Sequence, residues 1–280
     1  MKIEEHEIDK DCFLRDWLKN QFSKRRITSL KRNGGMTIDG KTIRADERVY
    51  VGQVIRLEFT EEKVKDFIPV DLGLKVVYED EDITVIKKGK GITPMPTVRH
   101  PKNSILNGMK YLFPNNTYRV MTRLDKDTEG LVLLANNALT QSRTFSINKY
   151  YVAVVEGRIE KEITVDLPID RGFGIERVIG GDKQCISIIK PIWTGKNYTF
   201  VMMQPITGRT HQLRLHTAHI GHSIVGDTVY GSAKGEYNSG QMLACVKLEI
   251  THPTTQKIIS VSLDDLYNDY FEFAKNIDNQ

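Results

Sequence analysis

Residues 121–135 read MTRLDKDTEGLVLLA, a polar loop that runs directly into an apolar strand. The loop contains Arg123, Asp125 and Asp127, and the strand begins at Leu131. A strand of a central sheet is a rigid support, so a carboxylate in a loop anchored to it is well placed to face a substrate. In an isolated loop the simpler interpretation is that Asp125 caps a turn and pairs with Arg123. The stretch is therefore compatible with a structural turn or with part of an active site.

Apolar runs of strand length recur on both sides of this loop. They occupy residues 75–78, 83–86, 131–134, 151–155, 186–189, 198–203, 242–250 and 258–261. Only a few helical stretches interrupt them. This density of strands predicts an α+β domain built on a large, mainly antiparallel sheet.

The first 60 residues have a different pattern. Apolar residues between Leu14 and Phe22 recur at helical spacing, and a second helix over 27–33 is expected to end at a left-handed C-cap at Gly34-Gly35. A hairpin with Asp39-Gly40 at its turn and a closing strand over 54–59 should follow. The pattern predicts a small module of two helices and a hairpin sheet.

The net charge of +4 is small, but basic residues gather in this module. Seven Lys or Arg residues lie between Arg15 and Arg32, against the single acid Asp16. They form a phosphate-facing surface if they share one side, and an ordinary solvated helix face if they do not. The RNA-binding candidates are Lys19, Lys24, Arg25, Arg26, Lys31 and Arg32.

Length and composition fit a soluble globular protein with one catalytic domain and a small appendage. We place the small domain at 1–62, a linker at 63–73 and the catalytic domain at 74–280. The charged start MKIEEHEIDK is not a signal peptide, and the apolar run after Gly130 is too short to cross a membrane. The three scattered cysteines form neither a disulfide framework nor a metal knuckle. We expect a cytoplasmic protein that does not engage a membrane.

The segment RLDKDTEG (123–130) resembles the RLDxxTSG signature of the RluA/RluD-type pseudouridine synthases. The resemblance implies that Asp125 is the catalytic residue. It departs from the signature at Glu129, where Ser is usual. Three further motifs follow in the family's order, so the resemblance spans about residues 74 to 263. The two helices and hairpin resemble the α-L RNA-binding domain found at the front of many RNA-modifying enzymes.

The further motifs place other residues of the family's site. KYYVAVVEG (149–157) resembles KxYxAxxxG and implies that Tyr151, rather than Tyr150, is the active-site tyrosine. TGRTHQLRLH (207–216) resembles TGRTHQIRxH and implies that Arg214 is the cationic partner of the carboxylate. GHSIVGD (221–227) is similar to GxPIxGD. Departures from the family pattern occur at Lys87-Lys88-Gly89-Lys90-Gly91, Pro94-Met95-Pro96, Ser223 and Leu243-Ala244-Cys245.

The implied activity is the isomerisation of uridine in RNA to pseudouridine, with ribosomal RNA favoured over transfer RNA. A carboxylate can break the bond between ribose and base as a nucleophile or as a base, and the uridine must leave its stack to reach it. Neither a metal nor an organic cofactor is implied, and we expect a monomer. The implied substrate-binding residues are Arg123, Thr128, Arg209, His211, Gln212 and Leu243.

Two other functions stay open from the residues. His211, His216, His219 and His222 lie close together, as in a metal-dependent hydrolase, although no acidic or cysteine ligand accompanies them. A catalytically silent RNA-binding protein, such as a ribosome assembly factor, is the second alternative. Retention of an acid facing a phosphate-rich ligand argues against that alternative.

Overall fold

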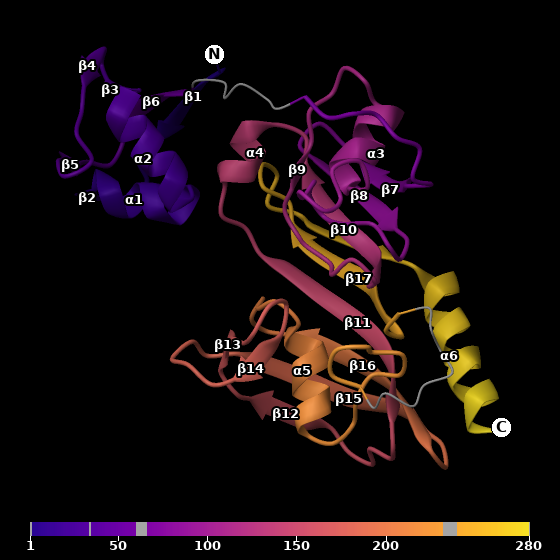
Figure 1. Ribbon diagram of the computed structural model, residues 1–280. Coiled ribbons are helices and arrows are strands. Elements are labelled where there is room, and N and C mark those ends of the chain that lie inside the picture. The colour runs from indigo at the N-terminus through magenta and orange to yellow at the C-terminus, as the bar shows by residue number, and fades with distance from the viewer. Residues whose placement is uncertain (1, 34, 60–65, 232–239, 280) are drawn as a thin grey trace.

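The computed structural model describes residues 2–33, 35–59, 66–231 and 240–279. Two separate β-structures are visible in Figure 1, a small one near the N-terminus and a long sheet that runs through the rest of the chain. The predicted α+β class is confirmed, because the long sheet is mainly antiparallel and carries few helices.

The N-terminal module, residues 2–59, has its own apolar core. Helix α1 contributes Leu14, Trp17 and Leu18 to this core, as its spacing predicts. In the described part of the module the strand order of the main sheet is β1-β6-β3-β4, with β2 and β5 paired beside it. The elements are β1 (Lys2–Glu7), β2 (Cys12–Phe13), α1 (Leu14–Gln21), α2 (Lys24–Asn33), β3 (Met36–Ile38), β4 (Lys41–Thr42), β5 (Arg48–Val49) and β6 (Val54–Phe59).

The predicted hairpin turn is confirmed. Asp39 and Gly40 have φ of 50° and 74°, the left-handed pair that a tight two-residue hairpin requires. Helix α2 begins three residues earlier than predicted, and the proposed C-cap at Gly34 lies outside the described residues. Strand β1 was not predicted, because its sequence KIEEHE lacks apolar alternation. Its pairing with β6 forms through backbone hydrogen bonds, which charged side chains do not prevent.

Within residues 66–231 and 240–279, strands follow one another in the order β12-β15-β16-β11-β17-β10-β8-β7, with β18 paired to β17 and β9 to β10. Every described pair is antiparallel except β10 with β17. The elements are β7 (Lys75–Glu79), β8 (Ile83–Lys88), α3 (Ile105–Leu112), β9 (Arg119–Val120), β10 (Glu129–Ala135), α4 (Ala138–Ser142), β11 (Ile147–Glu156), β12 (Ile163–Asp166), β13 (Ile169–Arg171), β14 (Arg177–Ile179), β15 (Ile186–Thr194), β16 (Tyr198–Pro205), α5 (Gln212–His219), β17 (Leu243–Thr251), β18 (Ile258–Ser262) and α6 (Asp264–Asp278).

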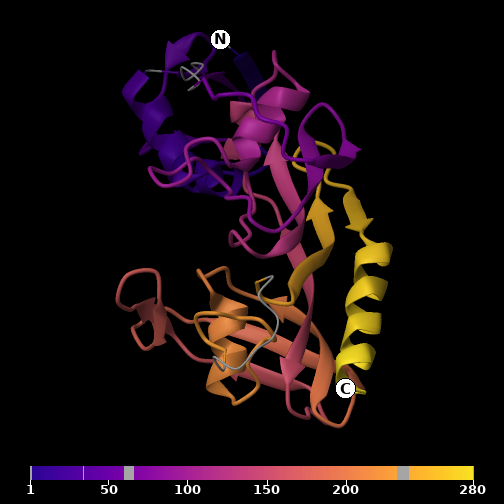
Figure 2. The same cartoon turned by 45° about the vertical axis from the view of Figure 1, so that its right-hand side comes forward.

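Two helices cover different sides of the central strands, with α6 on one side of β11 and β16 and α5 on the other (Figure 2). On the α6 side, Phe200 of β16 packs against Tyr267 and Phe271. The opposite side, where α5 lies, carries the site described below. No helix in the described ranges is long and apolar enough to cross a membrane.

Candidate active site

Gly130 brings strand β10 close to β17, where the two strands are parallel. Its φ is 112°, and a Cβ at this position would lie 2.1 Å from the carbonyl oxygen of Cys245. Only glycine combines this φ with so close an approach. The loop that precedes β10 is thereby held at one end of the sheet.

The loop over 121–128 is fixed from inside the protein. Lys88 is fully buried, and its Nζ donates hydrogen bonds to the carbonyl oxygens of Lys126 (2.9 Å) and Gly89 (3.0 Å). Burial lowers the pKa of Lys88 to about 8, against the attraction of nearby acidic groups. The Thr128 hydroxyl accepts a hydrogen bond from Gln241 Nε2 at 2.9 Å. These contacts leave the Asp125 carboxylate partly exposed on a constrained loop.

The turn before helix α5 is held by Gln212. Its Oε1 accepts hydrogen bonds from Thr207 Oγ1 (2.9 Å) and the Arg209 N–H (3.0 Å), and its Nε2 donates to Ile186 O and Ser187 Oγ. His211 at the N-cap has a φ of 58°, which is unusual for a residue other than glycine. The Gln212 amide is thus used within the protein, which indicates a role in positioning the turn.

Arg214 links two carboxylates beneath the pocket. Its Nη1 donates to Asp125 Oδ2 at 3.2 Å, and its Nε and Nη2 donate to the two oxygens of Asp227 at 2.6 and 2.7 Å. Burial would raise the pKa of Asp227, but the hydrogen bonds and charge of Arg214 outweigh it and hold that pKa below its ordinary value. The fork shared with Asp227 fixes the plane of the guanidinium and aims its remaining edge at Asp125.

His211 lies beside the same carboxylate. Its Nε2 is 3.8 Å from Asp125 Oδ2, and its Nδ1 is 2.9 Å from the hydroxyl of Tyr230. Burial lowers the pKa of His211 below its ordinary value, although the charge of Asp125 acts in the opposite direction. The imidazole is therefore neutral at pH 7, and Arg214 supplies the fixed positive charge beside Asp125.

Tyr151 and Tyr150 face different surroundings. Tyr151 is 7% exposed and lines the pocket, and burial followed by the nearby Cys245 and Asp125 raises its pKa well above the ordinary value. Its hydroxyl therefore stays protonated at pH 7. Tyr150 donates its hydroxyl hydrogen to Glu249 at 2.9 Å and is not among the residues that line the pocket. Of the two tyrosines, Tyr151 is therefore the one that faces the pocket.

The site is a pocket of about 580 Å³, a size suited to a small organic group. Every catalytic or substrate-binding residue named from the sequence lies in its wall, although those residues come from four separate parts of the chain. They are Arg123, Asp125, Thr128, Tyr151, Arg209, His211, Gln212, Arg214 and Leu243.

The histidines of α5 and its flanks point to different partners. His216 is buried between Ser187 Oγ and the Leu167 carbonyl oxygen, and His222 Nδ1 lies 2.8 Å from the Glu156 carbonyl oxygen. In the parts of the chain that the structure describes, no three His, Cys, Asp or Glu side chains gather as metal ligands do. The observed contacts of His216 and His222 are structural.

The family model for RNA pseudouridylate synthase matches residues 82–219, which include Asp125, Tyr151 and Arg214. Ribosomal large subunit pseudouridine synthase D of Pseudomonas aeruginosa is 34% identical over 225 residues, 75% of this chain and 70% of that protein. The uncharacterised RNA pseudouridine synthase YjbO of Bacillus subtilis is 34% identical over 251 residues, 84% of this chain and 88% of that protein. The chain belongs to the RNA pseudouridine synthase family.

Solved structures of such synthases have the same fold. Human RNA pseudouridylate synthase domain containing 1 superposes on this synthase with a TM-score of 0.58 at 25% identity, covering 69% of this chain and 83% of that one. Human RNA pseudouridylate synthase domain containing 4 gives a TM-score of 0.55 at 18% identity, covering 71% and 92%. The chain is thus an RNA pseudouridine synthase in sequence and in fold.

Sequence reasoning did not assign a site role to several groups that shape the synthase pocket. Asp227 ends the GHSIVGD motif and Lys149 begins the KYYVAVVEG motif, but neither motif implies a role for them, and Tyr230 lies three residues beyond Asp227. Burial lowers the pKa of Lys149, which lines the pocket one strand position before the tyrosines. Lys88 fell in a segment noted only for departing from the family pattern. Its position at the end of an apolar strand was the available signal.

The basic residues predicted to bind RNA differ in how exposed their side chains are. Lys19, Lys24, Lys31 and Arg32 are exposed, as a phosphate-facing surface requires. Arg26 differs from the expectation, because it is 8% exposed and its guanidinium carbon lies 4.1 Å from the centre of the Phe59 ring. The side chain of Arg25 lies outside the described part of the synthase.

Proposed function

We propose that this synthase converts a uridine of ribosomal RNA to pseudouridine, with Asp125 as the catalytic residue. The observation that carries the proposal is the pocket carboxylate of Asp125 held 3.2 Å from a fixed Arg214 guanidinium. A carboxylate can attack carbon or accept a proton, and Arg214 gives this one a cationic partner at the pocket. The Pseudomonas relative is a ribosomal large subunit pseudouridine synthase by name, which supports the ribosomal target.

The reaction rearranges bonds within one nucleotide. The bond from ribose C1′ to N1 of uracil breaks, the base turns, and C5 forms the new bond to C1′. The C5 hydrogen is then released as a proton, and N1, freed from the ribose, gains a proton. Asp125 assists as a nucleophile at C1′ or as a base at the sugar, and both routes need its carboxylate close to the ribose. No redox change or external group is required.

The remaining pocket residues hold the base and the sugar. Tyr151 offers an aromatic face and a protonated hydroxyl to the detached uracil. Arg123 is exposed at the pocket mouth. It binds the phosphate of the nucleotide or fills the gap that the flipped base leaves in the RNA stack. Because the reacting atoms of a stacked uridine cannot enter the pocket, the substrate uridine must flip out of its helix or come from a single strand.

The chain divides into two functional parts in this proposal. Residues 1–62 bind RNA through exposed basic side chains in the manner of an α-L domain, and 74–280 form the catalytic domain. Residues 66–73 lie between them, where Val70 N–H donates to the Asn107 carbonyl oxygen of α3. We propose a monomer that acts in the cytoplasm.

The test is chemical mapping of pseudouridine in ribosomal and transfer RNA from cells with and without the gene. A pseudouridine missing from ribosomal RNA, and restored by the wild-type gene, is the expected result. A site missing only from transfer RNA would refute the ribosomal target. Unchanged maps of both RNAs would refute the assigned substrate classes.

A further inference from the structure

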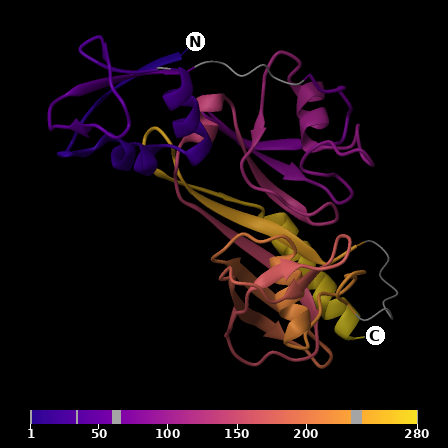
Figure 3. The ribbon, with the colours of Figure 1, turned by 60° about the vertical axis from the view of Figure 1, so that its left-hand side comes forward.

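The N-terminal module is docked on the catalytic part through α4 and the segment after it. Leu139 of α4 is 3% exposed and belongs to the apolar core of the module. Two backbone hydrogen bonds cross the junction, from Ser23 N–H to the Ser142 carbonyl oxygen at 2.7 Å and from Thr144 N–H to the Gln21 carbonyl oxygen at 3.1 Å. Figure 3 shows α4 between the module and the long sheet. The two parts therefore share packed and hydrogen-bonded structure.

Arg143 is the charged centre of this junction. Its Nη2 donates to Glu4 Oε1 of β1 at 2.9 Å, and its Nη1 donates to the Pro253 carbonyl oxygen in the β17–β18 turn at 2.8 Å. The side chains of Arg143 and Glu4 are only 19% and 13% exposed, so water weakens the pair less than at an open surface. Burial would raise the pKa of Glu4, but the hydrogen bond from His6 and the charge of Arg143 hold it below its ordinary value.

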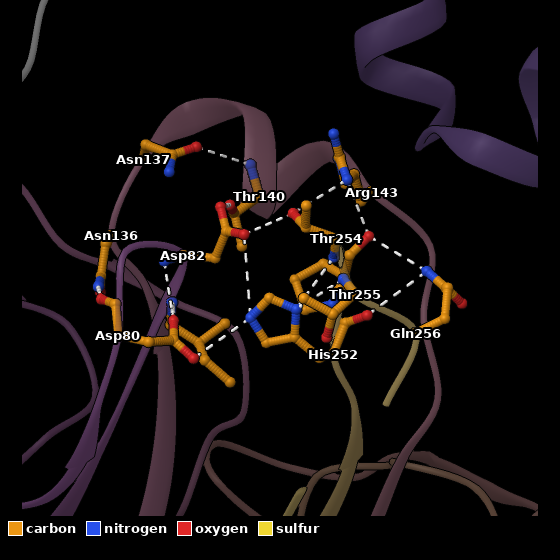
Figure 4. Close-up of polar contacts among 12 residues, drawn as sticks. Asp80, Asp82, Asn136, Asn137, Thr140, Arg143, His252, Thr254, Thr255 and Gln256 are labelled. Carbon is orange, nitrogen blue, oxygen red and sulfur yellow. Dashed lines mark hydrogen bonds and ion pairs between the residues drawn. The ribbon is translucent and has the colours of Figure 1, made fainter. Parts of the chain in front are cut away.

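The turn that accepts from Arg143 is itself held in place, as Figure 4 shows. His252 Nδ1 accepts hydrogen bonds from two backbone N–H groups of the turn, and its Nε2 lies 3.2 Å from Asp80 Oδ2. Thr254 donates its hydroxyl hydrogen to Asp82. The β17–β18 turn is thereby tied to the β7–β8 turn, and the carbonyl oxygen of Pro253 is held in place.

The docking segment continues directly into the wall of the catalytic pocket. From Phe145 onward, alternate residues along the chain point to the pocket. These residues are Phe145, Ile147, Lys149 and Tyr151. Arg143 precedes Tyr151 by eight residues, and one continuous segment connects the docked module to the site of chemistry.

We infer that Arg143 is a positioning residue that sets which uridine is modified, by fixing the N-terminal module at one distance and orientation from the pocket. This inference rests on the proposed function. An RNA held by the module places one flipped uridine at the pocket when the two parts are rigidly joined. When the junction loosens, the same module delivers other uridines at comparable effective concentration. The chemistry at Asp125 does not depend on the junction.

The test compares junction variants on transcripts of 16S and 23S ribosomal RNA, with every pseudouridine mapped. Glu4→Lys places a cation against Arg143 and should lower the ratio of modification at the preferred uridine to that at all other uridines at least fivefold. Total turnover at saturating RNA should stay within twofold of wild type. Small-angle scattering of the free protein should show a larger radius of gyration.

Three further variants separate the junction from general charge and folding effects. Glu7→Lys makes the same charge change on the exposed face of β1 and should behave as wild type. Glu4→Gln keeps an oxygen that accepts from Arg143 and should retain most of the site preference. Arg143→Met, with folding checked by circular dichroism, should repeat the loss of preference seen with Glu4→Lys.

The outcomes are distinct. An unchanged site preference in both Glu4→Lys and Arg143→Met would overturn the inference and leave the proposed function intact. Equal loss of preference in Glu7→Lys would also overturn it, because added positive charge would then explain the effect. If the wild-type protein formed no pseudouridine in either transcript while modifying transfer RNA, the proposed ribosomal target would fail and the inference with it.

Discussion

The guanidinium of Arg214 lies 3.2 Å from the carboxylate of Asp125, although 89 residues separate them in the chain. Its other edge is occupied by both oxygens of Asp227, so the guanidinium has little freedom to turn away. An arginine held in this way offers Asp125 a charge that needs no reorganisation when the substrate arrives. The arrangement separates two tasks, because Asp125 faces the pocket while Asp227 is buried and orients its partner.

Asp125→Asn should abolish isomerisation while RNA affinity and stability stay near wild type. The amide has nearly the size of the carboxylate but is neither a nucleophile nor a base of comparable strength. The measurement is tritium release from uridine labelled at C5 in RNA. Asp127→Asn in the same loop is the matched control and should keep activity within a few-fold. Turnover near wild type in Asp125→Asn would remove Asp125 from its assigned role.

Asp227→Asn should lower both stability and turnover. The substitution leaves the buried Arg214 without its bidentate anionic partner, and breaking a buried pair in this way costs about 3 to 5 kcal/mol. Urea unfolding measures the loss in free energy of unfolding, and tritium release measures turnover. Asp269→Asn on the exposed face of α6 should change neither. If Asp227→Asn were as active as wild type, Arg214 would not need this support.

The motif residues of the site were predictable, but their supports were not. Asp125, Tyr151 and Arg214 lie in motifs whose order and spacing are readable from the sequence. The pairing of Asp227 with Arg214 depends on how the loop after α5 folds back, which local sequence does not specify. The apolar run before Lys88 was a weak signal of burial, because a lysine beside Lys87 after such a run is usually at a surface.

The N-terminal module was likewise predictable from the sequence only in part. Its helices and hairpin followed from apolar spacing and the Asp39-Gly40 turn, which are local signals. Arg26 looked like its basic neighbours, yet it packs on Phe59, a residue from the last strand of the module. Charge counts do not reveal which long side chains lie along apolar surface. The docking contact of Arg143 could not be predicted from the sequence either, because its partners, Pro253 and Glu4, come from opposite ends of the chain.

Tyr151→Phe should retain RNA binding but lower turnover about 100-fold if the hydroxyl transfers or orients a proton. Tyr150→Phe is the control in the adjacent position. It removes a hydrogen bond to Glu249 and should cost about 1 kcal/mol of stability with little effect on turnover. Steady-state tritium release from each variant provides kcat and KM. A larger defect in Tyr150→Phe would assign the catalytic hydroxyl to the other tyrosine.

Lys88→Met should reveal the pH dependence of a buried charge. Because burial lowers the pKa of Lys88 to about 8 from 10.5, the folded protein loses this proton between those values while the unfolded chain keeps it. Below pH 8 the folded protein bears the full free-energy cost of burying the charged Lys88 side chain. This cost declines as pH rises toward 10.5. The free energy of unfolding of wild type relative to Lys88→Met should therefore rise by about 2 kcal/mol from pH 7 to pH 10. Urea unfolding across this series measures it, and a constant or falling difference would contradict the prediction.

Removing exposed basic residues from the N-terminal module should weaken RNA binding and flatten its salt dependence. Lys24, Lys31 and Arg32 are exposed on α2, so replacing all three with Ala removes up to three phosphate contacts. Each contact releases counterions and contributes about 0.7 to 0.9 to the slope of log affinity against log salt. Turnover at saturating RNA should not change, because none of the three lines the catalytic pocket. Binding across a salt series, measured with ribosomal RNA transcripts, provides the slope.

A second triple variant gives the same charge change far from the module. Its residues are exposed on β15, on the β15–β16 turn and beside β12, at the other end of the molecule in Figure 1. They are Lys161, Lys190 and Lys196, each replaced by Ala. If RNA contacts are concentrated on α2, this control should leave the RNA affinity and the slope of log affinity against log salt close to wild type. Equal slopes for the two triple variants would instead mean that α2 presents an ordinary solvated face and that RNA is held elsewhere.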